Sequence, residues 1–190
     1  MTSHSSSRPR WLPERRFPAY AYLSGRQPHP VRDPGGHSYD PSGHSGRVEP
    51  NIAAAGASLG SEEFRFGLDL FNHGYYWEAH EAWEGLWQMS EKRDPLRMFF
   101  KGLILLAAAG VKIREGKRAA ALRHAGRAAS LLNRLPEISD NPFERALGMS
   151  PSTLAEYAVA AAGNRAVLEE TPSGQPQPVF SFVLGPRTSA

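Results

Sequence analysis

A short stretch of this chain combines aromatic side chains with an imidazole and several carboxylates. It reads FNHGYYWEAHEAWEGLW over residues 71–87, with Gly74 as a break before a helical pattern. At about 100° per residue, this helix places its apolar residues on one side. His80 and Glu84 lie four residues apart at the edge of that side, and Glu81 lies next to His80. These polar groups need partners or solvent, because a buried, unpaired charge is costly.

His80 and Glu84 have the spacing of two ligands that hold one metal ion from a single helix. The histidines of the zinc-binding H-E-x-x-H pattern use the same spacing. Glu81 would add a second carboxylate. The ligand set would be completed by residues of the N-terminal segment, namely His29, Asp33 or His37. Mixed imidazole and carboxylate ligands suit zinc, manganese or iron, so a divalent metal is a candidate cofactor.

The same residues also suit proton transfer without a metal. Glu81 and Glu84 would act as catalytic acceptors of protons or charge, and His80 would orient them. An apolar surrounding raises the pKa of a carboxyl group toward neutrality, where an imidazole exchanges protons readily. The neighbouring aromatic residues would then hold a small ligand. This ligand pocket is expected to be lined by Asn72, Tyr76, Trp77, Trp83 and Lys101, the last from the next helix.

A structural interpretation of the stretch remains open. His80 and Glu84 would then form a hydrogen-bonded pair that closes the edge of the core, and the protein would be a non-enzymatic interaction module. Glu78 is expected to point roughly toward solvent, since it lies away from the apolar side of the helix. The sequence therefore leaves open whether the protein is an enzyme.

The stretch also resembles a family signature. The pattern F-N-x-G-x-Y-W-E-A-H-E-x-W-E-x-x-W, read from residues 71–87, is similar to that of the domain of unknown function 309 family. The resemblance implies a small all-helical bundle. It implies no particular reaction, because the family has no established activity.

The residues around the signature predict an all-α fold. Ser61, Asp94-Pro95 and Ser150-Pro151 are typical of helix starts. A nearly uninterrupted apolar run over residues 103–111 predicts a central, buried helix. The predicted helices cover residues 61–73, 75–89, 95–115, 117–134 and 151–169, with a single turn between 142 and 148. Short connections favour antiparallel neighbours, which indicates an up-and-down bundle of four to five helices.

Prolines and glycines are concentrated on both sides of the helical part. We expect disorder over residues 1–16, and an extended arm with a flexible connector over 17–60. The arm contains apolar and aromatic residues, so it is expected to wrap the bundle. Residues 61–170 form the predicted bundle domain. Residues 171–190 are a proline-rich tail, in which the apolar run 179–184 is expected to dock as an extended strip.

Composition narrows the class of protein. The chain has 190 residues, a net charge of +3 and no cysteine, which suits a reducing cytoplasm. Its longest apolar run is too short to span a membrane. A small-molecule ligand and a homo-oligomer stay open as partners. A basic set near the turn between residues 112 and 118 would permit weak nucleic-acid binding, but a solvated helix face is the better interpretation.

Overall fold

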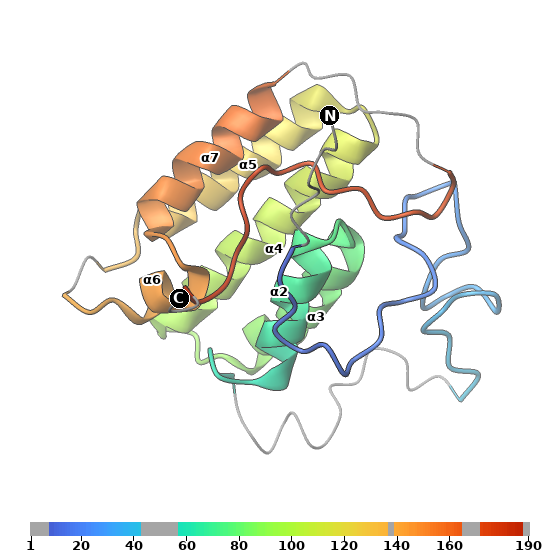
Figure 1. Ribbon diagram of the computed structural model, residues 1–190, viewed down its shortest axis with the longest axis horizontal. Helices are drawn as coiled ribbons and strands as arrows, with labels where there is room; N and C mark the ends of the chain where they lie inside the picture. The colour runs from blue at the N-terminus through green and yellow to red at the C-terminus, as the bar shows by residue number, and fades with distance from the viewer. Residues whose placement is uncertain (1–7, 43–56, 137–138, 165–171, 188–190) are drawn as a thin grey trace, which may run out of the picture.

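The computed structural model describes residues 8–42, 57–136, 139–164 and 172–187. Throughout this described part the regular structure is helical, which confirms the predicted all-α bundle with an extended N-terminal arm (Figure 1). The helices are α2 (Glu62–Asn72), α3 (Tyr76–Met89), α4 (Pro95–Arg114), α5 (Arg118–Leu132), α6 (Pro142–Leu147) and α7 (Pro151–Gly163).

The helix boundaries follow local capping chemistry. The Ser61 side chain accepts a hydrogen bond from the Phe64 N–H at the start of α2, and the Asp94 side chain accepts one from Leu96 at the start of α4. Ser150 caps α7 in the same way, with Pro151 as its first residue. The predicted ranges agree with α2 to α5 within about two residues. Helix α7 ends at Gly163, and the predicted continuation to residue 169 falls mostly outside the described residues.

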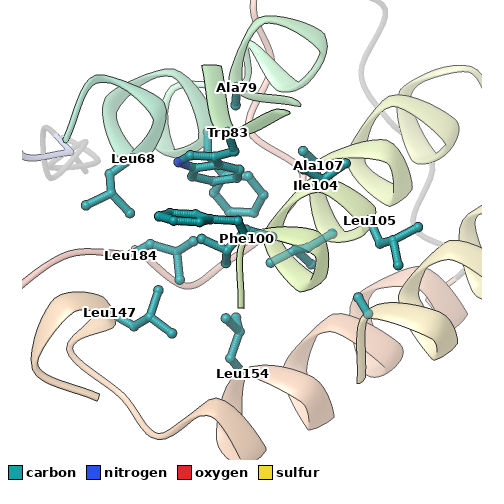
Figure 2. Packing of buried hydrophobic residues seen from close by; sticks show 14 of the residues in the cluster. Leu68, Ala79, Trp83, Phe100, Ile104, Leu105, Ala107, Leu147, Leu154 and Leu184 are labelled. Atoms are coloured by element: carbon teal, nitrogen blue, oxygen red, sulfur yellow. The ribbon is translucent and has the colours of Figure 1, made fainter. Parts of the chain in front are cut away.

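Helices that follow each other along the chain pack against each other from α2 to α5, and α7 packs on α5. Helix α4 is buried on nearly all sides, as its apolar composition predicts. Figure 2 shows Leu68 of α2, Trp83 of α3 and Phe100 of α4 in the core, together with Leu184 of the C-terminal segment. Trp83 is fully buried. A Cβ atom on Gly67 of α2 would lie 2.2 Å from the Trp83 indole nitrogen, so the glycine permits this close approach.

The N-terminal residues correct one prediction. Residues 8–16 fall in the range for which we expected disorder, but they lie against α2 and the C-terminal segment. The buried Asp69 carboxylate accepts hydrogen bonds from the backbone N–H groups of Trp11 (2.6 Å) and Leu12 (2.9 Å), and from Arg10 (2.9 Å). Arg8 donates to the carbonyl oxygens of two C-terminal residues. The Ser- and Arg-rich composition predicts disorder, but it does not reveal that Arg10 pairs with Asp69, which lies 59 residues further along the chain.

The arm and the C-terminal segment lie side by side on one face of the bundle (Figure 1). The Ala21 N–H donates to the Gly174 carbonyl (2.8 Å), and Gln27 bonds to Ser173 (2.8 Å). Phe180 and Leu184 are buried, so the expected docking of the apolar strip is confirmed. Both segments therefore add to the core. No helix in the described part of the chain is long and apolar enough to cross a membrane.

Candidate functional site

Helix α3 brings His80, Glu81 and Glu84 together at one edge of the bundle. Each residue offers one ligand atom, and these three atoms lie within 4.8 Å of one another. His80 Nε2 lies 3.7 Å from Glu84 Oε2. His80 and Glu84 are half-buried and Glu81 is exposed, so the cluster, which we call the α3 cluster, is open to solvent.

Burial, followed by neighbouring charges, shifts the pKa values of His80 and Glu81. The pKa of Glu81 is raised to about 7, chiefly by loss of water around its carboxyl group and then by the charges of Glu84 and Glu78. Arg32 of the arm opposes this increase. Burial lowers the pKa of His80, while Glu84 acts in the opposite direction. Near neutral pH the imidazole is therefore neutral, and Glu81 is close to its midpoint of protonation.

Lys101 of α4 lies close enough to the α3 cluster for its charge to act on His80. Its ammonium nitrogen lies 4.4 Å from the centre of the Trp87 ring on α3. The charge of Lys101 contributes to the lowered pKa of His80, and so does the charge of His124 on α5. Residues of three helices, α3, α4 and α5, thus determine the electrostatic environment of the cluster.

Three residues expected to line a ligand pocket are core residues instead. Trp83 and Asn72 are fully buried, and Tyr76 is 2% exposed. The Asn72 amide donates to the Leu184 carbonyl (2.7 Å) and accepts from the Leu184 N–H (2.8 Å). The Tyr76 hydroxyl accepts from the Val179 N–H (2.7 Å). These hydrogen bonds hold the C-terminal segment against α2 and α3.

The arm histidines do not reach the α3 cluster, which corrects the predicted metal ligand set. His37 Nε2 lies 3.3 Å from Glu78 Oε1. His29 Nδ1 accepts from backbone N–H groups of its own turn, and its ring packs on Trp77 with 5.6 Å between centroids. Trp77, expected to line the pocket, thus lies under the arm. Trp77 packs against Tyr22 and His29 of the arm, and Glu78 bonds to Tyr22 and His37, so the arm covers this part of α3.

The prediction that Glu78 points toward solvent is wrong. It is 6% exposed rather than solvent-facing, and its Oε1 atom also accepts from the Tyr22 N–H (2.9 Å). Its Oε2 atom is buried and has no hydrogen-bond partner among the described residues. A helical wheel assigns faces from the bundle alone, so it could not reveal that the arm covers this face. The histidines within the stiff Pro- and Gly-rich arm were the available hint.

Comparison with known proteins supports the resemblance seen in the sequence. Residues 64–124 match the model of the family described as Domain of unknown function (DUF309), which confirms that resemblance. The matched segment runs from α2 into α5 and so includes the whole α3 cluster. It covers roughly a third of the chain and leaves out the arm and the C-terminal segment. A search of curated proteins finds no match, and neither does a search of solved structures.

Proposed function

We propose that the α3 cluster binds one divalent metal ion through His80, Glu81 and Glu84. The observation that carries the proposal is the convergence of their three ligand atoms within 4.8 Å. An imidazole with two carboxylates suits zinc, manganese or iron. Three protein ligands leave coordination positions for water or a small molecule.

The charges of the cluster support a cation here. Glu84 and Glu78 both raise the pKa of Glu81, which means that the negative charges repel one another. A bound cation would remove this repulsion. The lowered pKa of His80 also favours the neutral imidazole, which is the form that binds a metal.

The chemistry available to such a site follows from its exposure. A metal ion with an open position would act as a Lewis acid or lower the pKa of a bound water. Lys101, whose ammonium group lies over the Trp87 ring beside the cluster, would attract an anionic group of a small ligand. These roles make metal-assisted binding of a small molecule the function that best fits the cluster.

Titration of the purified full-length protein with Zn²⁺ and Mn²⁺, followed by calorimetry, tests the proposal. We expect one site per chain in the wild type. His80→Ala and Glu84→Gln should each weaken binding about 10-fold to 100-fold, since each removes one ligand from the site. Glu91→Gln is the matched control, because Glu91 is an exposed carboxylate outside the cluster. Equal affinities in all variants, or no binding by the wild type, would overturn the proposal.

A non-enzymatic packing role is the second candidate function for the signature. It is favoured by the burial of Asn72, Tyr76 and Trp83, which join α2, α3 and the C-terminal segment. If the wild type binds no metal, this role accounts for the aromatic half of the signature. The protein would then present some other surface to its partner.

A further inference from the structure

A hydrogen-bonded chain links an exposed serine to a buried carboxylate where the arm meets α3. Ser38 Oγ lies 3.0 Å from His37 Nδ1, and His37 Nε2 lies 3.3 Å from Glu78 Oε1. Ser38 is exposed, whereas the side chains of His37 and Glu78 are 9% and 5% exposed. We infer that Ser38 is an activated nucleophile, with His37 as its general base, and that it accepts acyl groups from activated esters.

The order of the three groups is that of a nucleophile, a base and an orienting carboxylate. Glu78 is acceptor-only when ionised, so His37 Nε2 carries the proton that it donates to Glu78. This tautomer leaves Nδ1 as an acceptor for the Ser38 hydroxyl. The carboxylate therefore selects the form of His37 that can take a proton from serine.

The environment of Glu78 favours this role. Its Oε1 atom accepts from both the Tyr22 N–H and His37, while its buried Oε2 atom has no partner in the described chain. A buried carboxylate with an unpaired oxygen is stabilised by positive charge nearby. Protonation of His37 during attack by serine would supply that charge next to Glu78.

The arm holds His37 and Ser38 in fixed backbone geometry. The His37 N–H donates to the Tyr20 hydroxyl (3.3 Å), and the Tyr20 ring packs edge-on against the imidazole at 4.5 Å between centroids. The Ser38 N–H donates to the Pro30 carbonyl (3.0 Å). The nucleophile and its base are therefore positioned before any reagent arrives.

The proposed step transfers one acyl group. Ser38 Oγ bonds to the carbonyl carbon of the ester, and its proton passes to His37 Nδ1. The bond from that carbon to the leaving oxygen breaks, and the alcohol or phenol departs with the proton from His37. The products are O-acyl-Ser38 and the free alcohol or phenol, so the imidazole returns to its starting state. None of the three residues is a ligand of the proposed metal site, although the charge of Glu78 contributes to the raised pKa of Glu81 and so couples the two sites.

Incubation of the full-length protein with p-nitrophenyl acetate tests the inference. We expect a burst of p-nitrophenolate and one added acetyl group, located on Ser38 by peptide mass spectrometry. Ser38→Ala should abolish the burst. Ser42→Ala is the matched control, because Ser42 is an exposed serine of the same arm, and its hydroxyl donates to the Asp40 carboxylate. It should react like the wild type.

Two further variants test the relay. His37→Gln should slow acetylation at least tenfold, and Glu78→Gln should lower the maximal rate without changing the reagent concentration at half-maximal rate. Because Glu78 acts through His37, the double variant should be no slower than His37→Gln alone, a result that a purely structural role would not give. If Glu78→Gln does not fold, two results still test the inference: whether the acetyl group is on Ser38, and whether His37→Gln slows acetylation. Acetylation spread over several serines, or unchanged in His37→Gln, would overturn the inference.

Discussion

At the scale of single residues, helix α3 divides its polar groups between two environments. His80, Glu81 and Glu84 meet at an open edge, where their atoms can converge on one ion. Glu78, only one turn earlier, is buried under the arm and pairs with His37. Glu81 lies three residues after Glu78 on the same side of α3, so burial under the arm, rather than position on the helix, makes the two carboxylates different.

Substitution of Glu81 should change how stability depends on pH. The pKa of Glu81 is raised to about 7 in the folded protein, so the folded state binds this proton more tightly than the unfolded state does. The carboxyl group therefore favours folding at low pH, and this contribution is lost as pH rises toward and through about 7. We expect Glu81→Gln to be more stable relative to the wild type at pH 8 than at pH 5, as measured by urea denaturation.

The control for this experiment is Glu91→Gln, which removes an exposed carboxylate outside the α3 cluster. Its effect on stability should be nearly the same at both pH values. The effect of Glu81→Gln should itself be modest, because Glu81 is exposed and solvent screens its interactions. A stability difference that does not change with pH would contradict the raised pKa.

At the scale of elements, close approach between helices depends on small residues. Gly67 of α2 lies against the Trp83 indole, and Gly110 of α4 lies against the Tyr76 ring. A Cβ atom at position 67 would come within 2.2 Å of the Trp83 ring, and one at position 110 would come within 2.6 Å of the Tyr76 ring. The aromatic residues of α3 thus pack on its neighbours where glycines make room for them.

Gly67→Ala should destabilise the protein. Alanine favours a helix over glycine by about 1 kcal/mol, but overpacking a core costs typically about 1–3 kcal/mol. Because Trp83 is fully buried and cannot move aside freely, we expect a net loss of up to about 2 kcal/mol in thermal or urea unfolding. Gly85→Ala in α3 is the matched control, since nothing lies within 4 Å of its Cβ position. It should be neutral or stabilising, and an equal loss at both sites would exclude the packing explanation.

At the scale of the whole molecule, both terminal segments are joined to the bundle through α2. Asp69 holds residues 10–12, and Asn72, less than one turn later, holds Leu184. The Trp11 indole N–H also donates to the Leu184 carbonyl (3.1 Å), which links the two segments directly. Folding of α2 and docking of both segments should therefore be coupled.

Asn72→Ala should weaken this coupling. The change removes two buried hydrogen bonds and leaves the Leu184 N–H and carbonyl without the amide. The Leu184 carbonyl keeps its hydrogen bond from the Trp11 indole, so only the N–H is left unsatisfied, at a cost of roughly 1–3 kcal/mol, and the second lost bond costs about 1 kcal/mol. We therefore expect a loss of about 2–4 kcal/mol in urea unfolding. Hydrogen exchange should also become faster at Leu184. Asn133→Ala, an exposed change at the end of α5, should cost less than about 1 kcal/mol and leave this exchange rate unchanged.

The sequence by itself determined the helices and the α3 cluster. Capping residues such as Ser61 and Asp94 mark boundaries locally, and His80 and Glu84 are brought together by the geometry of a single helix turn. These features depend on neighbours within a few residues, so they can be read without knowledge of the rest of the fold.

Only the tertiary structure decided the partners of Glu78, Asn72 and Asp69. Glu78 meets His37 from 41 residues away, and Asn72 meets Leu184 from 112 residues away. The sequence shows that each of these groups needs a partner, but many distant groups could satisfy the same donor or acceptor. The choice among them depends on how the arm and the C-terminal segment bury their apolar residues against the bundle. That burial is a property of the whole chain. Hydrophobic contact is non-directional, so a short sequence pattern does not identify which distant residues will pack together.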